Sequence, residues 1–209
     1  MKVLVIGGTR GVGHEVVLAA HAAGHELTLL ARNAERISLP VTGVRVVAGD
    51  AGDADDIERA VAGQHAVVWT VGVGPTRQPV DLFSRSTQFL LAAMAKHGVR
   101  RLICVTGVGA GDSRGHGGFL YDRILQPLFM KTVYADKDRQ EVLLRASDVD
   151  WTIVRPAALT NRPATGLVRA LTDLDGVTAG KVSRADVAGF IVENLATDDY
   201  RKTAVLLTS

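Results

Sequence analysis

A cluster of glycines directly behind an apolar, β-branched run constrains this chain more than any other feature. Residues 3–6 have the composition of a buried strand, and residues 15–20 have that of a helix. In the loop between them, one glycine permits a tight turn, a second lets backbone N–H groups approach a diphosphate, and a third lets the helix pack closely on the strand. The start of the helix adds partial positive charge. The loop therefore predicts a dinucleotide site. Its predicted contacts are Gly7, Thr9, Arg10, Gly11, Val12 and Gly13.

The rest of the chain alternates short apolar runs with longer segments of helical composition. The predicted strands are 3–6, 27–30, 44–47, 66–70, 101–105, 151–154 and 203–207, and the predicted helices are 15–20, 54–61, 81–96, 134–146 and 187–195. Strands that are apolar on both faces and separated by helices predict a parallel sheet with helices on both sides. We therefore expect an α/β, doubly wound, three-layer αβα Rossmann fold. Residues 1–209 would form a single domain with a small C-terminal portion on the substrate side.

Two stretches have little pattern, residues 107–118 and residues 156–180. Both follow predicted strand ends on the side of the sheet where ligands bind. Loops of this length are usually functional lids or mobile segments. The apolar stretch 119–130 beyond the first loop is predicted to cover an aromatic substrate, with a subunit contact or plain core as alternatives.

Composition excludes several classes of protein. The 47% hydrophobic and 22% charged residues suit a globular chain with a full core. The net charge of +2 is carried by scattered basic residues, so we expect neither a nucleic-acid nor a membrane partner. The single cysteine excludes an internal disulfide, and no cluster has metal-ligand spacing. Without a leader pattern or an apolar run of about 20 residues, the chain is expected to be cytoplasmic, and an oligomer is compatible with it.

The end of the second predicted strand distinguishes between the two nicotinamide cofactors. NAD-binding chains place an acidic residue roughly 20 residues after the glycine loop, whereas this chain has Arg32 between Ala31 and Asn33. A guanidinium binds a 2′-phosphate that a carboxylate would repel. Arg10 can reach the same phosphate, and Arg36 is a third candidate. The charges therefore predict NADP(H), the alternative being that these arginines are solvated surface residues.

Further cofactor contacts are predicted where the third and fourth strands end. Asp50, followed by Ala51, is placed to accept a hydrogen bond from the adenine amino group. The alternative is a turn-forming aspartate that caps the next helix. Beyond the fourth strand, Val71 and Gly72 are small enough to let the backbone approach the adenosine ribose and the diphosphate.

Several stretches resemble one group of proteins. They are Gly7-x-x-x-Gly11-x-Gly13, Gly49-Asp50-Ala51, Val105-Thr106-Gly107, 150–156 and 183–188. Over nearly the whole chain, the sequence is similar to the atypical short-chain dehydrogenases/reductases. These are NAD(P)H-binding proteins related to biliverdin reductase B (a flavin reductase), NmrA and isoflavone reductase. The resemblance implies a Rossmann fold that binds NADP(H), with a cofactor contact at Pro156.

The catalytic motif of the standard short-chain enzymes is altered here. In their Tyr-x-x-x-Lys, the tyrosine donates a proton and the lysine lowers the pKa of the tyrosine and holds the nicotinamide ribose. This chain has Tyr134 and Lys137, one residue too close, and Leu125 follows Tyr121 at the lysine spacing. The resemblance still implies a functional Lys137 and places Thr106 where a serine polarises the substrate. The alternatives are a solvated lysine and a β-branched strand residue.

The first loop adds His116 as a candidate general acid, with a mobile polar loop that has no chemistry as the alternative. Flavin reduction needs no obvious proton donor, because the ring accepts hydride directly once it is oriented. We therefore expect an NADP(H)-dependent oxidoreductase that passes hydride to a flavin, a quinone or another conjugated small molecule. The alternatives are an NADP(H)-binding redox sensor without turnover, resembling NmrA, and a relative of the nucleotide-sugar epimerases.

Overall fold

A computed structural model describes residues 1–33 and 39–209, and its central feature is an eight-stranded sheet in the order β3-β2-β1-β4-β5-β6-β10-β8. Its strands are β1 (Lys2–Ile6), β2 (Glu26–Ala31), β3 (Arg45–Ala48), β4 (Ala66–Trp69), β5 (Arg101–Val105), β6 (Asp150–Pro156), β8 (Arg169–Leu171) and β10 (Thr203–Thr208). All neighbours pair in parallel except β8, which runs antiparallel to β10. A small parallel pair, β7 (Ala158–Thr160) and β9 (Lys181–Ser183), lies beside the sheet.

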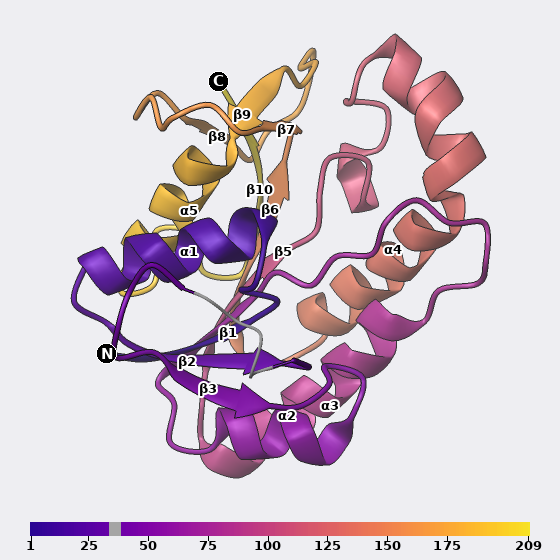
Figure 1. Cartoon of the computed structure of the whole chain (residues 1–209). Coiled ribbons are helices and arrows are strands. Elements are labelled where there is room, and N and C mark those ends of the chain that lie inside the picture. The colour runs from indigo at the N-terminus through magenta and orange to yellow at the C-terminus, as the bar shows by residue number, and fades with distance from the viewer. Residues whose placement is uncertain (34–38) are drawn as a thin grey trace.

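Helices cover both faces of the sheet (Figure 1). They are α1 (Gly11–Ala22), α2 (Ala54–Val61), α3 (Leu82–His97), α4 (Lys131–Arg145) and α5 (Arg184–Glu193), with the short η2 (Gly111–Ser113) and the wide-turned η3 (Tyr121–Met130) between β5 and α4. α1 and α5 lie side by side on one face, while α2, α3 and α4 lie on the other. This arrangement confirms the predicted three-layer αβα Rossmann fold.

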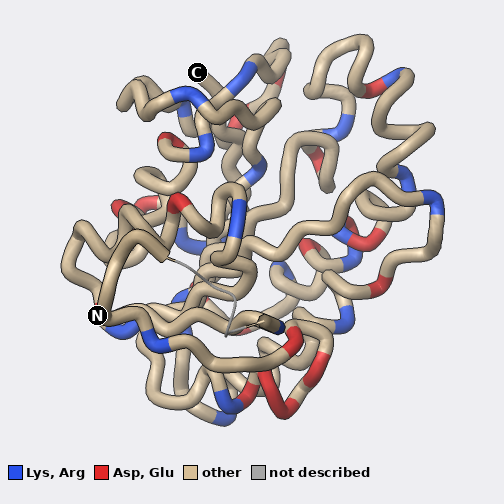
Figure 2. The backbone as a smooth tube through the Cα atoms, viewed as in Figure 1, with Lys and Arg blue, Asp and Glu red and all other residues tan. Residues whose placement is uncertain are grey.

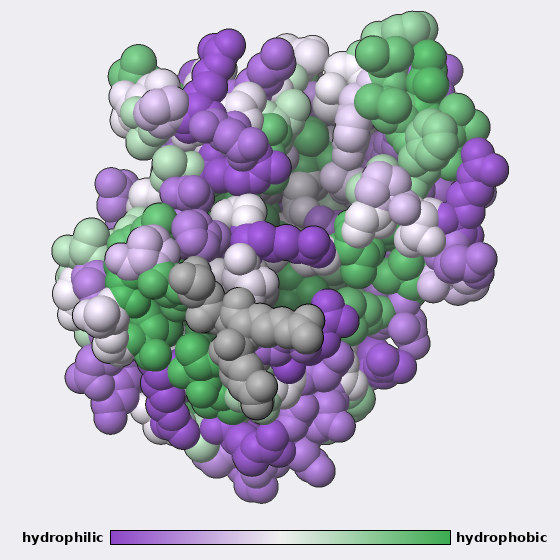
Figure 3. Space-filling view, viewed as in Figure 1, coloured by the Kyte–Doolittle hydropathy of each residue, from purple (hydrophilic) through white to green (hydrophobic). Residues whose placement is uncertain are grey.

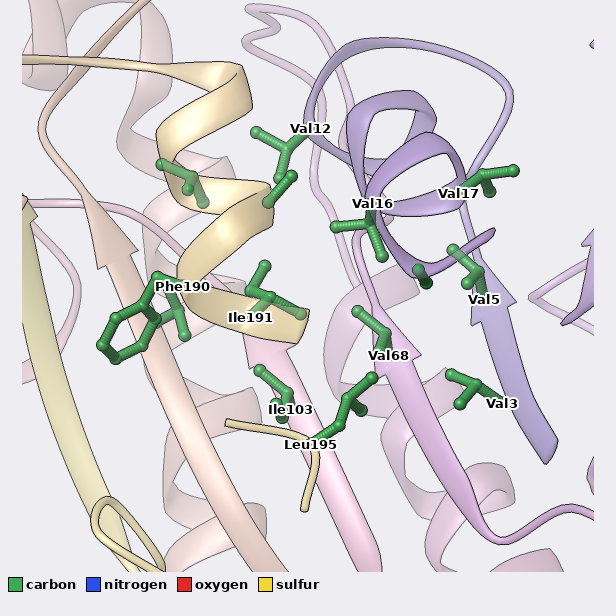
Figure 4. Packing of buried hydrophobic residues seen from close by; sticks show 14 of the residues in the cluster. Val3, Val5, Val12, Val16, Val17, Val68, Ile103, Phe190, Ile191 and Leu195 are labelled. Atoms are coloured by element: carbon green, nitrogen blue, oxygen red, sulfur yellow. The ribbon is translucent and has the colours of Figure 1, made fainter. Parts of the chain in front are cut away.

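Two apolar cores, one on each face, hold the layers together. In the first, shown in Figure 4, Val16 of α1 and Ile191 of α5 pack on Val5 and Val68 of the sheet. In the second, apolar residues of α2, α3 and α4 pack on the opposite face. Alternate strand side chains therefore point into different cores, which explains why the strands are apolar on both faces. Cys104 is buried in the second core.

Several local features differ from the sequence-based expectation. α1 begins at Gly11 and α4 at Lys131, both earlier than predicted. The first turn of α1 contains glycines and that of α4 has a mixed composition, so neither shows the composition typical of a helix. The second patternless stretch contains β7, β8 and β9, whose three residues each are too few to show a period. α5 also begins earlier than the predicted residue 187, at Arg184, where the hydroxyl of the N-cap residue Ser183 accepts a hydrogen bond from the Asp186 N–H at 2.9 Å.

The order of the strands determines where a ligand can bind. β1 pairs with β2 on one side and with β4 on the other, so the crossovers diverge at this point. Between such diverging connections a crevice opens at the carboxyl ends of the strands. In the described part of the chain, no helix is long and apolar enough to cross a membrane. No group of three or more His, Cys, Asp or Glu among these residues is arranged to hold a metal ion.

Candidate functional site

A cavity of about 1010 Å³ lies at the carboxyl ends of the first strands and is lined by the glycine loop and by the segments that follow β2, β3 and β4. Most of the predicted cofactor contacts lie in its wall. They are Gly7, Thr9, Arg10, Gly11, Val12, Arg32, Asp50, Ala51, Val71, Gly72, Thr106 and Lys137. Gly13 and Pro156 lie elsewhere. The cavity is thus built mainly from short stretches that each follow one strand.

The glycine loop is shaped for close backbone approach. Gly7 and Gly11 have φ angles of 92° and 60°, which L-side chains rarely adopt. A Cβ atom at Gly13 would lie 2.3 Å from the Gly7 carbonyl oxygen, so Gly13 lets α1 pack on the end of β1 and does not itself line the cavity. The side chain of Arg10, the N-cap residue of α1, makes no capping hydrogen bond. The first N–H groups of α1 are therefore available to an anion such as a diphosphate.

The two predicted arginines both line this cavity. Arg10 projects from the glycine loop and Arg32 from the end of β2, and both are exposed. No described acidic residue forms an ion pair with either of them. Arg36, the third predicted candidate, lies outside the described residues. Two guanidinium groups beside one cavity suit a ligand that carries several phosphate groups.

A further arginine lines the cavity that sequence reasoning did not assign to the site. Arg184 starts α5, and its Nε atom lies 3.8 Å from where a Cβ atom of Gly11 would be. Its Nη1 atom donates a hydrogen bond to Asn161 Oδ1 at 2.6 Å. Asn161 is neutral, so this contact leaves the charge of the guanidinium uncompensated. A basic residue immediately after an N-cap, at the ligand edge of the sheet, is the signal that could have revealed it.

Asp50 forms the turn expected of it but does not cap the next helix. Its Oδ1 atom accepts a hydrogen bond from Gly52 N at 2.7 Å, which stabilises the turn after β3. The cap of α2 is Asp53, whose Oδ1 accepts from Asp56 N at 3.0 Å, and not Asp50. Asp50 also lines the cavity, so the adenine contact stays a prediction.

A second cavity of about 610 Å³ adjoins the first, and Val105, Thr106, Lys137 and Leu159 line both. Its other walls come from residues 107–108, 117–121, 156–158 and 179–180 together with Leu125 and Tyr134. Pro156 lies here rather than in the larger cavity. Most of this lining is apolar. The two loops with little sequence pattern therefore meet to enclose a chamber that suits an apolar small molecule.

Lys137 stands where the two cavities meet. Its Nζ atom donates a hydrogen bond to the Thr106 carbonyl oxygen and lies 5.5 Å from the ring centroid of Tyr134. Burial lowers the pKa of Lys137 to about 8, against the opposing influence of the Glu141 carboxylate. Although it is one residue nearer to the tyrosine than in the standard motif, this lysine still reaches the junction of the cavities.

The Thr106 hydroxyl is held by a buried ion pair. It donates a hydrogen bond to Glu141 Oε1 at 2.8 Å, and the same oxygen accepts from Arg155 Nε at 3.0 Å. Arg155 is 1% exposed, and Asp112 completes its ion pairs. The hydroxyl hydrogen of Thr106 is therefore directed to Glu141 rather than to a bound substrate. Sequence reasoning missed Glu141 and Arg155 because nothing in a single chain pairs residues 14 positions apart on different elements.

Two tyrosine hydroxyls meet in the second cavity. Tyr121 donates a hydrogen bond to the Tyr134 hydroxyl oxygen at 2.7 Å. Burial raises the pKa of both phenols. Since a hydroxyl has one hydrogen and two lone pairs, the Tyr134 hydrogen stays available to a ligand. Tyr121 thus belongs to the site, although its sequence spacing to Leu125 gave no sign of this.

His116 does not line either cavity among the described residues. Its Nδ1 atom lies 2.7 Å from the Val177 carbonyl oxygen, and its own carbonyl accepts a hydrogen bond from Ala179 N. In this structure the histidine therefore joins the two loops behind the second cavity. Its predicted role as a general acid stays a prediction.

Comparison with known proteins identifies the family. The family described as NAD(P)H-binding matches residues 7–198. A Bacillus subtilis (strain 168) protein named uncharacterized sugar epimerase YhfK is 32% identical, over 100% of this chain and 94% of its own length. The (4-alkanoyl-5-oxo-2,5-dihydrofuran-3-yl)methyl phosphate reductase of Streptomyces griseus is 31% identical over 81% of this chain, which spans 55% of that protein.

A solved structure extends this likeness to three dimensions. ChuY, an anaerobillin reductase from Escherichia coli O157:H7, superposes with a TM-score of 0.83 and 25% identity. The match covers 100% of this chain and 97% of that one. These likenesses confirm the predicted resemblance to NAD(P)H-binding proteins.

Proposed function

The chain belongs to the NAD(P)H-binding family, and we propose that it is a reductase that transfers hydride from NADP(H) to an apolar, conjugated small molecule. The meeting of the two cavities at Lys137 and Thr106 carries this proposal. The larger cavity has an uncapped helix start and flanking arginines, which suit a dinucleotide diphosphate. The smaller one is apolar and continues from the same point. A cofactor in one and a substrate in the other would therefore meet at this junction.

The residues present fit NADP(H). Backbone N–H groups of the glycine loop would bind the diphosphate, with Arg184 beside them. Arg32 and Arg10 would bind the 2′-phosphate, and Lys137 would donate hydrogen bonds to the nicotinamide ribose. When bound, the reduced cofactor supplies hydride.

The protein's own contribution to the reaction would come from the junction and the second cavity. The apolar walls exclude water and hold a flat substrate against the junction. The hydrogen of the Tyr134 hydroxyl, which Tyr121 leaves free, would pass to an oxygen or nitrogen of the substrate as the hydride arrives. The ammonium group of Lys137, whose Nζ lies 5.5 Å from the Tyr134 ring centroid, would stabilise the phenolate that this transfer leaves.

Names of similar proteins support the reaction class. The Streptomyces griseus relative and ChuY are both named reductases. The Bacillus subtilis relative is named a sugar epimerase, which favours the epimerase as a second candidate. An epimerase uses a bound nicotinamide without net consumption, so the two functions differ in whether NADPH is used up.

The decisive assay offers NADPH with a panel of quinones, flavins, enones and tetrapyrroles, and follows the loss of NADPH absorbance. We expect substrate-dependent oxidation with at least one conjugated acceptor. Tight NADPH binding without any oxidation would support the redox-sensor alternative instead. Conversion of a nucleotide sugar without loss of NADPH would support the epimerase.

Cofactor preference has a separate test in Arg32→Asp. Loss of a charge-assisted contact and the added repulsion should weaken NADPH binding by about 30-fold, with little effect on NADH. The matched control is Arg45→Asp, since Arg45 is also exposed and lines neither cavity. Equal weakening of NADPH and NADH binding would contradict the role of Arg32 at the 2′-phosphate.

A further inference from the structure

The segment 119–130, called here the apolar cover, concentrates the exposed apolar surface of the molecule. Six of the ten exposed large apolar side chains of the described residues lie on it. They are Phe119, Leu120, Ile124, Leu125, Leu128 and Phe129, exposed by 41% to 79%. Figure 3 shows the corresponding hydrophobic area at the upper right, where Figure 1 places the helical segment that leads into α4. A patch of this kind marks an interaction site on a folded protein.

The apolar cover has two sides with different surroundings. Phe119, Leu120 and Leu125 line the smaller cavity. Ile124 and Leu128, four residues apart, do not line it and are exposed. The patch therefore continues from the wall of the substrate cavity to the outer surface. An apolar ligand that leaves the cavity on this side meets more apolar surface before it meets water.

Three basic residues lie on or beside the apolar cover. Arg123 and Lys131 are exposed, and the Arg77 guanidinium lies 5.8 Å from the ring centroid of Phe129. Figure 2 shows Lys and Arg residues at this corner of the molecule. The acidic residue of the segment, Asp122, is half-buried and accepts a hydrogen bond from Gly117 N at 3.3 Å. Arg123 and Lys131 belong to this stretch of the sequence, and folding adds Arg77 from a distant segment.

We propose that the apolar cover binds an anionic lipid surface, with Ile124 and Leu128 in the interfacial layer and Arg77, Arg123 and Lys131 among the lipid headgroups. A helical segment with an apolar face and flanking cations has the chemistry of an interfacial anchor. A second copy of this chain suits the patch less well. A symmetric dimer would bring the same cations face to face, where like charges repel.

The small net charge of the whole chain predicts no membrane partner. The proposal departs from that prediction only at the apolar cover, where an apolar surface and basic residues lie together. It also gives the proposed reductase a source of substrate, since an apolar acceptor dissolved in lipid would enter the smaller cavity across the apolar cover. That last step rests on the proposed function, whereas lipid binding does not.

The test measures co-sedimentation of the full chain with vesicles of phosphatidylcholine alone or with about one third phosphatidylglycerol. We expect binding to the anionic vesicles and little to the neutral ones. Arg123→Gln with Lys131→Gln should lower the partition coefficient by roughly 25-fold, about fivefold for each charge. Ile124→Ser with Leu128→Ser should lower it by at least about tenfold, since each side chain loses apolar burial.

Matched controls use residues outside the patch. Leu167→Ser removes an apolar side chain that is 76% exposed, and Arg45→Gln with Lys2→Gln removes two exposed cations. Both should bind vesicles as the unaltered chain does. All variants should keep their NADPH affinity, which shows that they are folded and separates this test from that of the reductase activity.

Two results would overturn the proposal. One is that the unaltered chain binds anionic vesicles and that the patch variants and the control variants weaken this binding equally. The other is no vesicle binding together with self-association that Ile124→Ser and Leu128→Ser abolish, which would make the apolar cover a subunit interface.

Discussion

The two cavities are built in different ways. The larger one is lined chiefly by residues that directly follow β1, β2, β3 and β4, so each contribution comes from a short local motif. The smaller one is lined by parts of two long loops, by the apolar cover and by α4. Backbone groups and glycines shape the first cavity, whereas side chains from distant segments shape the second. A cofactor common to a family can be bound by backbone geometry, while the substrate depends on side chains that loops carry.

The glycine loop should show the largest effect if backbone geometry controls the larger cavity. In Gly13→Ala, the new Cβ would lie 2.3 Å from a backbone oxygen and 2.4 Å from Thr70 Oγ1. Backbone cannot give way as a side chain can, so α1 must shift and NADPH affinity should fall by more than about 100-fold. Fluorescence titration with NADPH measures this.

The matched control for that change is Gly189→Ala in α5, where an added Cβ meets nothing within 4 Å. It should keep full affinity and raise the free energy of unfolding by up to about 1 kcal/mol, because alanine favours a helix. Unchanged NADPH affinity in Gly13→Ala would show that the close approach of helix and strand is not needed for binding.

The hydroxyl pair of the smaller cavity should affect turnover and leave cofactor affinity alone. Tyr134→Phe should lower kcat by about 100-fold through loss of the proton donor. Tyr121→Phe should lower it by about tenfold, because Tyr134 loses the hydrogen bond that orients it. The double variant should match Tyr134→Phe, since the two hydroxyls act as one unit.

The third tyrosine supplies the control for this pair. Tyr200 packs on Phe190 with ring centroids 5.2 Å apart and lines neither cavity, so Tyr200→Phe should retain full kcat. A loss of NADPH affinity in Tyr134→Phe equal to its loss of kcat would contradict the assignment of cofactor binding to the larger cavity and of turnover to the smaller one.

The smallest effect should come from the pH response of Lys137, where the cavities meet. Because burial lowers its pKa to about 8, the ammonium is present below that pH and is lost above it. We expect kcat/KM to fall by about tenfold for each pH unit above roughly 8. Lys137→Met should be slower at neutral pH and should lack this fall. An unchanged fall in Lys137→Met would assign the ionisation to another group.

Sequence reasoning reached most of the fold and of the larger cavity. The strand and helix order, the glycine loop and the positions of Arg10 and Arg32 all follow from local patterns. Each needs only residues that are neighbours along the chain, so period and spacing are enough to predict them. Arg184 was not predicted to line the cavity, because its closeness to Gly11 depends on how α5 packs beside α1.

The smaller cavity was predicted only in outline. The long loops were expected at the ligand side of the sheet, but their contents could not be arranged from spacing. The pairing of Tyr121 with Tyr134 depends on how the wide turns of η3 lead into α4. Likewise, the Thr106 hydroxyl has an obvious role by position, and only its hydrogen bond to Glu141 shows where its hydrogen points.

The linear chain thus specifies a doubly wound sheet and a loop from Gly7 to Gly13 that can hold a diphosphate, because period, glycine and charge act over a few consecutive residues. Folding in three dimensions assigns the rest. It brings Lys137 to the junction of two cavities, joins two phenols across 13 positions and places Arg77 beside Phe129 of the apolar cover. Such contacts arise from the crossing of elements and the course of loops, which no local pattern encodes.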